Sequence, residues 1–115
     1  MKVVVNRGFG GFDLEKASVD LLLQCGVQMP GWYGYEKDFR TNDILVAIVT
    51  FNNARARHLG TEPTGLVILD IPDDATDWMI VDYDGAERII YVLDGKLHEI
   101  DPDDVYEEEE EHESD

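Results

Sequence analysis

The sequence predicts an α+β domain: one N-terminal strand and two helices packed on a small, mainly antiparallel sheet, followed by an acidic tail. Three observations support this fold class. A β-branched run opens the chain, two helical patterns follow it, and apolar runs separated by tight-turn signals fill the C-terminal half. With 115 residues, 43% of them hydrophobic, the chain has the size and apolar content for one core.

The first strand is predicted over Lys2–Asn6, because three consecutive valines are typical of a buried strand. A glycine-rich loop over residues 7–12 follows it. Asp13 is a good N-cap, and the helical pattern after it predicts a helix over about residues 14–25 that Gly26 ends. The predicted buried stripe of this helix consists of Leu14, Ala17, Leu21 and Cys25, widened by Leu22.

Residues 27–42 are predicted to form a long loop that is rich in aromatic side chains. Loops of this length often carry function. Two interpretations stay open, because aromatic side chains bury large areas wherever they lie. They cover an edge of the core, or they form a site from Trp32, Tyr33 and Tyr35.

Residues 43–59 fit either a buried strand or a helix. A helix is favoured, because Asn42 or Asp43 can cap it and basic residues fall in its last turn before Gly60. The predicted apolar face consists of Leu45, Ile48, Val49 and Asn52.

The C-terminal half predicts an antiparallel meander. Its strands are expected over Gly65–Ile71, Trp78–Tyr83, Arg88–Leu93 and Lys96–Ile100. The third of these is apolar on both faces, so we expect it to be central. Asp-Gly pairs at residues 84–85 and 94–95 join the last three strands, and this dipeptide between apolar runs is a strong hairpin signal.

The charge of the chain is distributed unevenly. There are 26 acidic and nine basic side chains, and the formal net charge is −17. Residues 101–115 hold ten acids and no base, whereas residues 1–100 carry a net charge of −7. We therefore predict a domain over residues 1–100 and an acidic, disordered tail over 101–115. Its run of glutamates is either a solvated segment or an interaction segment for a basic partner: Glu107, Glu108, Glu109, Glu110 and Glu111.

This charge argues against direct binding to nucleic acid or to an anionic membrane, because both need a basic surface. The chain has no apolar run near the roughly 20 residues that span a bilayer. Its opening residues do not read as a signal peptide. Cys25 is the single cysteine and is expected to be a buried, inert thiol, so a reducing cytoplasm is the expected location.

Two patterns suggest ligand chemistry only weakly. The order strand, Gly10-Gly11, helix is typical of a phosphate cradle, but a Walker lysine is missing and Asp13 stands where the anion would bind. Aspartates gather over residues 70–84, but their spacing does not complete an EF-hand loop, and the histidines lack metal-type spacing. The sequence therefore predicts no cofactor, no metal site and no catalytic residue.

Two stretches of the chain carry a resemblance to a known group. The first is Lys2–Asn6 followed by Gly10-Gly11-Phe12, and the second is Ile71-Pro72-Asp73-Asp74 followed by Trp78, Asp82-Tyr83-Asp84-Gly85 and Glu87. Together they resemble small uncharacterised acidic proteins encoded by bacteriophages and related bacterial mobile elements. The resemblance covers roughly residues 2–26 and 43–88. It implies a helix ahead of the Ile-Pro-Asp-Asp strand, but no activity and no functional residue.

We therefore expect a non-enzymatic binding or inhibitor protein that acts on a basic, nucleic-acid-binding host protein, with spaced carboxylates that mimic DNA phosphates. Two alternatives stay open: a small nucleotide- or metal-binding protein or enzyme that uses the glycine turn, and an acidic domain adapted to high salt. The candidate partner-binding residues are the glutamates 107–111 and Asp70, Asp73, Asp74, Asp77, Asp82 and Asp84.

Overall fold

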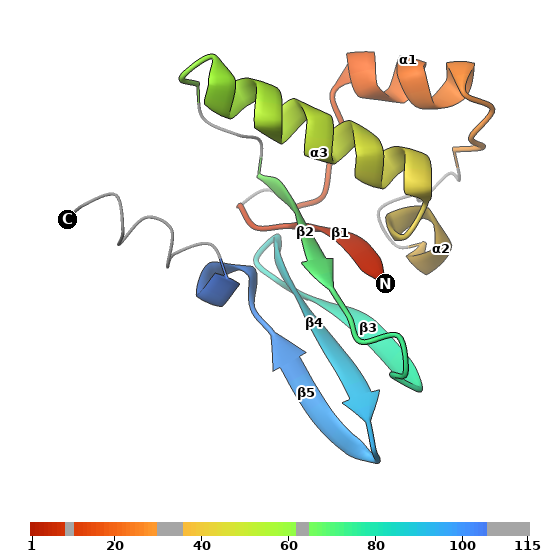
Figure 1. The fold of residues 1–115 in the computed structure, drawn as a ribbon, viewed down its shortest axis with the longest axis vertical. Helices are drawn as coiled ribbons and strands as arrows, with labels where there is room; N and C mark the ends of the chain where they lie inside the picture. The colour runs from red at the N-terminus through yellow and green to blue at the C-terminus, as the bar shows by residue number, and fades with distance from the viewer. Residues whose placement is uncertain (9–10, 30–35, 62–64, 106–115) are drawn as a thin grey trace.

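The computed structural model describes residues 1–8, 11–29, 36–61 and 65–105 (Figure 1). Its elements are β1 (Lys2–Asn6), α1 (Lys16–Gln24), α2 (Lys37–Arg40), α3 (Asp43–His58), β2 (Leu66–Asp70), β3 (Asp77–Tyr83), β4 (Ala86–Leu93) and β5 (Lys96–Ile100). The α+β class is confirmed. The strands are divided between two antiparallel sheets, β1–β2 and β3–β4–β5, instead of forming one sheet. β4 is the central strand of its sheet, as predicted.

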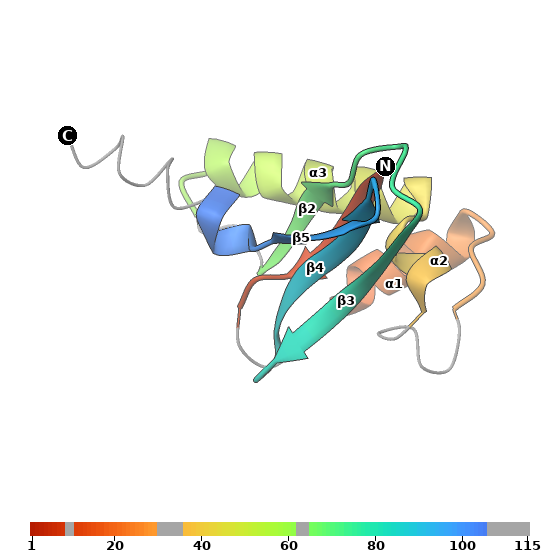
Figure 2. The same cartoon turned by 90° about the horizontal axis from the view of Figure 1, so that it is seen from below.

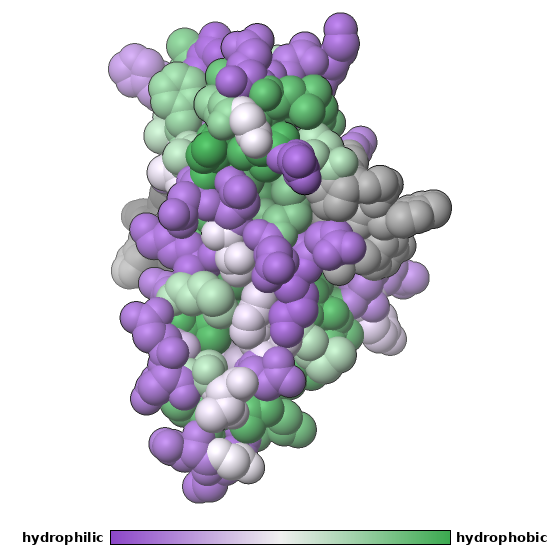
Figure 3. Space-filling view, turned by 90° about the vertical axis from the view of Figure 1, so that its right-hand side faces the viewer, coloured by the Kyte–Doolittle hydropathy of each residue, from purple (hydrophilic) through white to green (hydrophobic). Residues whose placement is uncertain are grey.

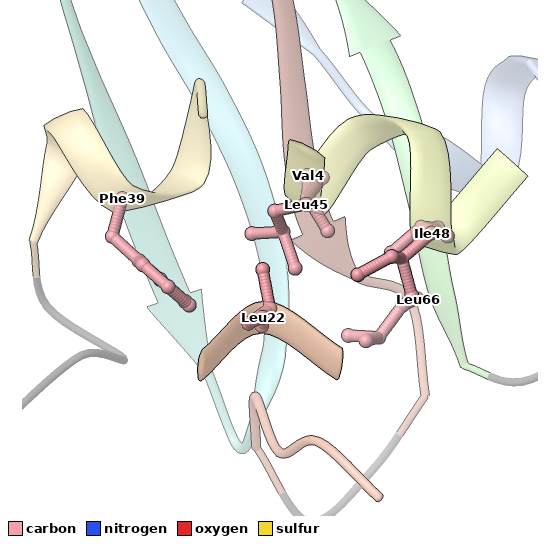
Figure 4. Packing of buried hydrophobic residues seen from close by; sticks show 7 residues of the cluster. Val4, Leu22, Phe39, Leu45, Ile48 and Leu66 are labelled. Carbon is pink, nitrogen blue, oxygen red and sulfur yellow. The ribbon is translucent and has the colours of Figure 1, made fainter. Parts of the chain in front are cut away.

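The elements form three layers, with α1 and α3 at one end, β1–β2 in the middle and the three-stranded sheet at the other end (Figure 1). One face of β1–β2 packs against the helices (Figure 4), through Val4, Leu22, Phe39, Leu45, Ile48, Val49 and Leu66. The other face packs against Ile89 of β4, through Val3, Val5, Val67, Leu69 and Ile71. β1 is therefore buried on both faces, as its valine run predicts.

α1 turns a different face to the core from the predicted one. Ser18 and Leu22 are buried, whereas Leu21 is 46% exposed and Cys25 is exposed. The prediction of a buried thiol is therefore wrong. Residues next to each other on a helix point about 100° apart. The run of three leucines over residues 21–23 therefore fits two overlapping stripes, and packing against α3 selects the stripe with Leu22.

The start of α1 also differs from the prediction, whereas its end agrees. The N-cap is Glu15 rather than Asp13, and it makes no side-chain capping bond. Asp13 Oδ1 instead accepts a hydrogen bond from the backbone N–H of Leu14, at 2.9 Å. Gly26 has φ +82° and donates to the Leu23 carbonyl, which is the left-handed C-terminal motif that the glycine predicts.

α3 begins at the predicted cap. The Asn42 side chain accepts hydrogen bonds from the backbone N–H groups of Ile44 and Leu45, at 2.9 and 3.2 Å. The buried polar residue on its inner face is Asn53, which donates to the Leu66 carbonyl at 2.9 Å, rather than the predicted Asn52. This bond ties the middle of α3 to β2.

Both predicted hairpin turns are confirmed. Asp84 and Gly85 have φ of 55° and 89°, and Asp94 and Gly95 have φ of 53° and 74°. A two-residue turn with positive φ at both positions matches the right-handed twist of the strands that it joins. β3 and β4 consequently run side by side along their length (Figure 2).

Two predicted loop segments contain structure. α2 lies inside the predicted loop over residues 27–42. In the predicted tail, residues 102–105 form a helical turn, Pro102 is buried, and Asp103 Oδ1 accepts a hydrogen bond from Arg7 Nε at 2.9 Å. The first tail residues therefore pack on the domain. The aromatic candidates Trp32, Tyr33 and Tyr35 and the glutamates 107–111 lie outside the described residues.

Candidate functional site

The six predicted aspartates do not form one surface. Asp70, Asp73, Asp74 and Asp77 lie near the start of β3, whereas Asp82 and Asp84 lie at its far end. With seven residues at about 3.4 Å each, the strand separates the two groups by roughly 20 Å. Figures 1 and 2 show that β3 runs along the sheet, so that its two ends lie at opposite ends of the sheet.

In the first group, the N-terminal amino group of Met1 holds two carboxylates. It lies 2.8 Å from Asp73 Oδ1 and 3.1 Å from Asp70 Oδ1, and it donates to the Ile71 carbonyl at 2.8 Å. The amino group holds the pKa of Asp73 below its usual range, and the hydrogen bonds to Asp73 and Asp70 raise the pKa of the amino group. All three groups are exposed, so the effect on stability is small.

Asp77 also accepts hydrogen bonds from donors of the same chain, Trp78 and Lys37. The backbone N–H of Trp78 lowers the pKa of Asp77 most, and Lys37, whose Nζ lies 3.4 Å from Asp77 Oδ1, lowers it further. The Lys37 ammonium also lies 4.4 Å from the centre of the Trp78 ring. These contacts fix α2 to the start of β3.

The ion pair at Met1 makes a prediction for pH. Because the pKa of Asp73 is lowered in the fold, its ionised carboxylate stabilises the fold at pH values above the ordinary carboxyl pKa. This stabilisation is lost as pH falls and the carboxylate is protonated. Because the pKa of the Met1 amino group is raised, the protonated amine stabilises the fold at pH values below the ordinary amine pKa. This stabilisation is lost as pH rises through the raised pKa. Asp73→Asn should move the amino pKa back toward its ordinary value, as measured from the pH dependence of its acylation rate. Asp74→Asn is the matched control, and an equal shift in the control would contradict the pairing.

In the second group, Asp82 and Asp84 lie at the β3–β4 hairpin, and Asp84 borders a hollow of about 580 Å³. Asp82 Oδ1 accepts a hydrogen bond from the backbone N–H of Gly85 at 2.8 Å. The hollow contains Arg7 and Arg88, and carboxylates pair with both. Arg7 contacts Asp103, and Arg88 contacts Glu99 at 2.8 Å and Asp101 at 3.9 Å. These arginines therefore offer no basic surface for a polyanion.

Gly8, Gly11 and the start of α1 border another hollow, of about 450 Å³, whereas Gly10 of the predicted turn lies outside the described residues. Gly11, Asp13, Glu15 and Ser18 are among the residues that line it. Two carboxylates thus stand between the turn and the helix N-terminus, where a phosphate would need backbone donors and a positive field. The geometry gives the phosphate-cradle interpretation no support.

A buried ion pair lies at the centre of the fold. Arg40 and Glu87 are 1% and 5% exposed, and the two guanidinium Nη atoms donate to the two carboxylate oxygens at 2.8 Å each. Arg40 also donates to the Val4 carbonyl at 3.1 Å, and Glu87 accepts from the Asn6 backbone N–H at 2.8 Å. The guanidinium carbon lies 3.7 Å from the centre of the Phe12 ring.

This pair closes the outer edge of β1 in place of a third strand. The backbone N–H of Ile71 donates to the Met1 carbonyl, and that of Arg7 donates to the Gly65 carbonyl. The backbone N–H and C=O groups of the odd-numbered residues of β1 therefore point toward β2. The backbone groups of Val4 and Asn6 point away from β2, where Arg40 donates to the Val4 carbonyl and Glu87 accepts from the Asn6 N–H. The predicted single sheet is divided at this point.

Sequence reasoning missed this pair. The one signal for it is a charged residue, Glu87, at the start of an apolar strand. Its partner comes from a segment predicted as loop. Two segments that are distant in the sequence, residues 2–12 and 71–87, meet at this pair. The Asn6 side chain donates to the Gly85 carbonyl at 2.7 Å, and Phe12 and Glu87 both contact Arg40.

The outer face of the three-stranded sheet is apolar and open. Met79, Tyr83 and Leu97 are 55%, 67% and 75% exposed. Cross-strand pairing puts Met79 beside Ile90, and Leu97 beside Val92. We call this surface the open face; its apolar residues are Met79, Val81, Ile90, Val92 and Leu97.

Carboxylates surround the open face. Asp77 and Glu99 lie on it, and Asp84 and Asp94 occupy the turns at its two ends. Figure 3 shows one side of the molecule, on which hydrophilic and hydrophobic residues alternate from the helical end to the strand end.

No family model matches the chain, and no curated protein or solved structure is significantly similar to it. Within the described ranges, no three histidine, cysteine or carboxylate side chains are grouped as a metal site would require. None of the described helices is long and apolar enough to cross a membrane.

Proposed function

We propose that this protein is a non-enzymatic, phage-type binding or inhibitor protein that engages a basic, nucleic-acid-binding protein of the host cytoplasm. The observation that supports this proposal is how the charged side chains are paired. Arg7, Lys37, Arg40 and Arg88 each lie against a carboxylate. Among the described residues, by contrast, the exposed Asp74, Asp84 and Asp94 pair with no cation.

Internal pairing thus neutralises four of the nine lysine and arginine side chains. The exposed cations Lys2, Lys16, Arg55, Arg57 and Lys96 remain, but the formal net charge of −17 leaves the chain strongly acidic. A surface of this kind attracts basic proteins and accelerates their association. Exposed carboxylates can also occupy positions that DNA phosphates take in a basic groove, so the proposed partner is one whose groove normally holds nucleic acid. Direct binding of nucleic acid by this chain is disfavoured for the same reason.

The test is affinity capture from a bacterial lysate with two baits, the full chain and a truncation after Val105. The truncation ends there because Asp101 and Asp103 hold Arg88 and Arg7 and belong to the folded part. Both baits should retain the same basic protein, and its affinity should fall at least about tenfold between about 0.05 and 0.5 M NaCl.

Three results would contradict the proposal. One is capture of proteins that are not basic, and another is binding that salt does not weaken. The third is a stability that rises steeply up to molar salt with no partner bound, which would favour adaptation to high salt. Thermal shifts with nucleotides or divalent ions test the remaining alternative.

A further inference from the structure

We propose that the open face is the docking surface for the basic partner, and that this partner presents an apolar ridge flanked by lysine or arginine side chains. This inference rests on the proposed function and assigns it a location. It predicts that apolar contacts, and not charge alone, select the partner.

The first argument is the pattern of exposure along the strands. Trp78 and Ile80 of β3 point into the core with Ile89, whereas Met79 and Val81, which alternate with them, point outward. An outward face of an antiparallel sheet is usually polar. Contiguous apolar residues on such a face, rimmed by polar ones, mark an interaction site.

The second argument is the charge around these residues. Two cations lie against carboxylates of this face: Glu99 neutralises Arg88 at 2.8 Å, and Lys37 lies 3.4 Å from Asp77. Asp84 and Asp94, in the turns, lie against no cation in the described part of the chain. Lys96 pairs with Leu93 and so lies on the opposite face of the sheet. The net rim charge is therefore negative. A second copy of this chain would bring like charges together, whereas a basic rim on a partner would complement them.

The experiment uses the full chain labelled with ¹⁵N and two synthetic peptides of about ten residues, long enough to cross the sheet. One alternates lysine with leucine, and the other alternates lysine with serine, so their charges are equal. The lysine–leucine peptide should shift the amide resonances of β3, β4 and β5 and bind at least tenfold more tightly than the lysine–serine peptide.

Variants locate the effect. The double variant Met79→Thr, Leu97→Thr removes apolar surface with a residue that strands accept well. It should reduce lysine–leucine binding to the lysine–serine level. Phe51→Thr on α3 is the matched control, because Phe51 is 65% exposed and lies outside the open face. It should leave binding unchanged, and thermal melting shows whether each variant is folded.

The outcomes separate the two proposals. Equal binding of both peptides, or shifts confined to other elements, would overturn the docking surface and leave the proposed function standing. Binding of neither peptide at low salt would contradict the proposed function itself. Concentration-dependent dimerisation that the double variant abolishes would assign the open face to a second copy and overturn the inference.

Discussion

Glu87→Gln should lower the free energy of unfolding by about 3–5 kcal/mol, because it leaves the Arg40 guanidinium buried without a countercharge. Gln keeps the size of the side chain, so a cavity does not contribute. Urea denaturation measures the change. The exposed Arg88–Glu99 pair supplies the control: Glu99→Gln should cost less than about 1 kcal/mol, since water screens that pair. Equal effects at the two sites would contradict the central role of the buried pair.

Replacing both charged residues tests whether Arg40 and Glu87 act only as an ion pair or also satisfy the backbone groups at the outer edge of β1. Replacing a buried pair by apolar residues is often neutral. Here Arg40→Met with Glu87→Leu would also orphan the Val4 carbonyl and the Asn6 N–H, at about 1–3 kcal/mol for each buried group. The double variant should therefore remain destabilised. Recovery of wild-type stability would show that the pair does not cap β1.

Leu22→Ala should destabilise the fold by about 2–5 kcal/mol, because Leu22 is fully buried against β1 and α3. Leu21→Ala, one residue away and 46% exposed, should change stability by less than about 0.5 kcal/mol. Thermal or urea unfolding of the two variants measures this difference. A larger loss for Leu21→Ala would mean that the sequence pattern, and not the structure, identifies the buried face of α1.

Local signals account for what the sequence predicted well. The Asp-Gly turns and the valine run determine backbone geometry within a few residues, so the two hairpins and β1 can be predicted from the local sequence alone. Asn42 likewise accepts hydrogen bonds from the backbone N–H groups two and three residues after it. These elements need no knowledge of their tertiary neighbours.

What the sequence left undetermined depends on contacts between distant residues. The burial of Leu22 rather than Leu21 depends on α3, and the pairing of Arg40 with Glu87 depends on three elements that meet only in the fold. The division of the aspartates depends on the direction of β3. The open face could not be predicted either, because the apolar residues of β3 and β4 fall on both faces of the sheet and the sequence does not show which face packs against β1–β2.

Competition with DNA tests the central claim most directly. A fluorescent duplex bound to the captured partner is titrated with this protein, and anisotropy reports the bound DNA. If carboxylates occupy the partner's DNA-binding groove, the protein should displace the duplex completely, and Met79→Thr, Leu97→Thr should weaken displacement at least tenfold. A ternary complex, in which the partner holds this protein and DNA together, would contradict the claim.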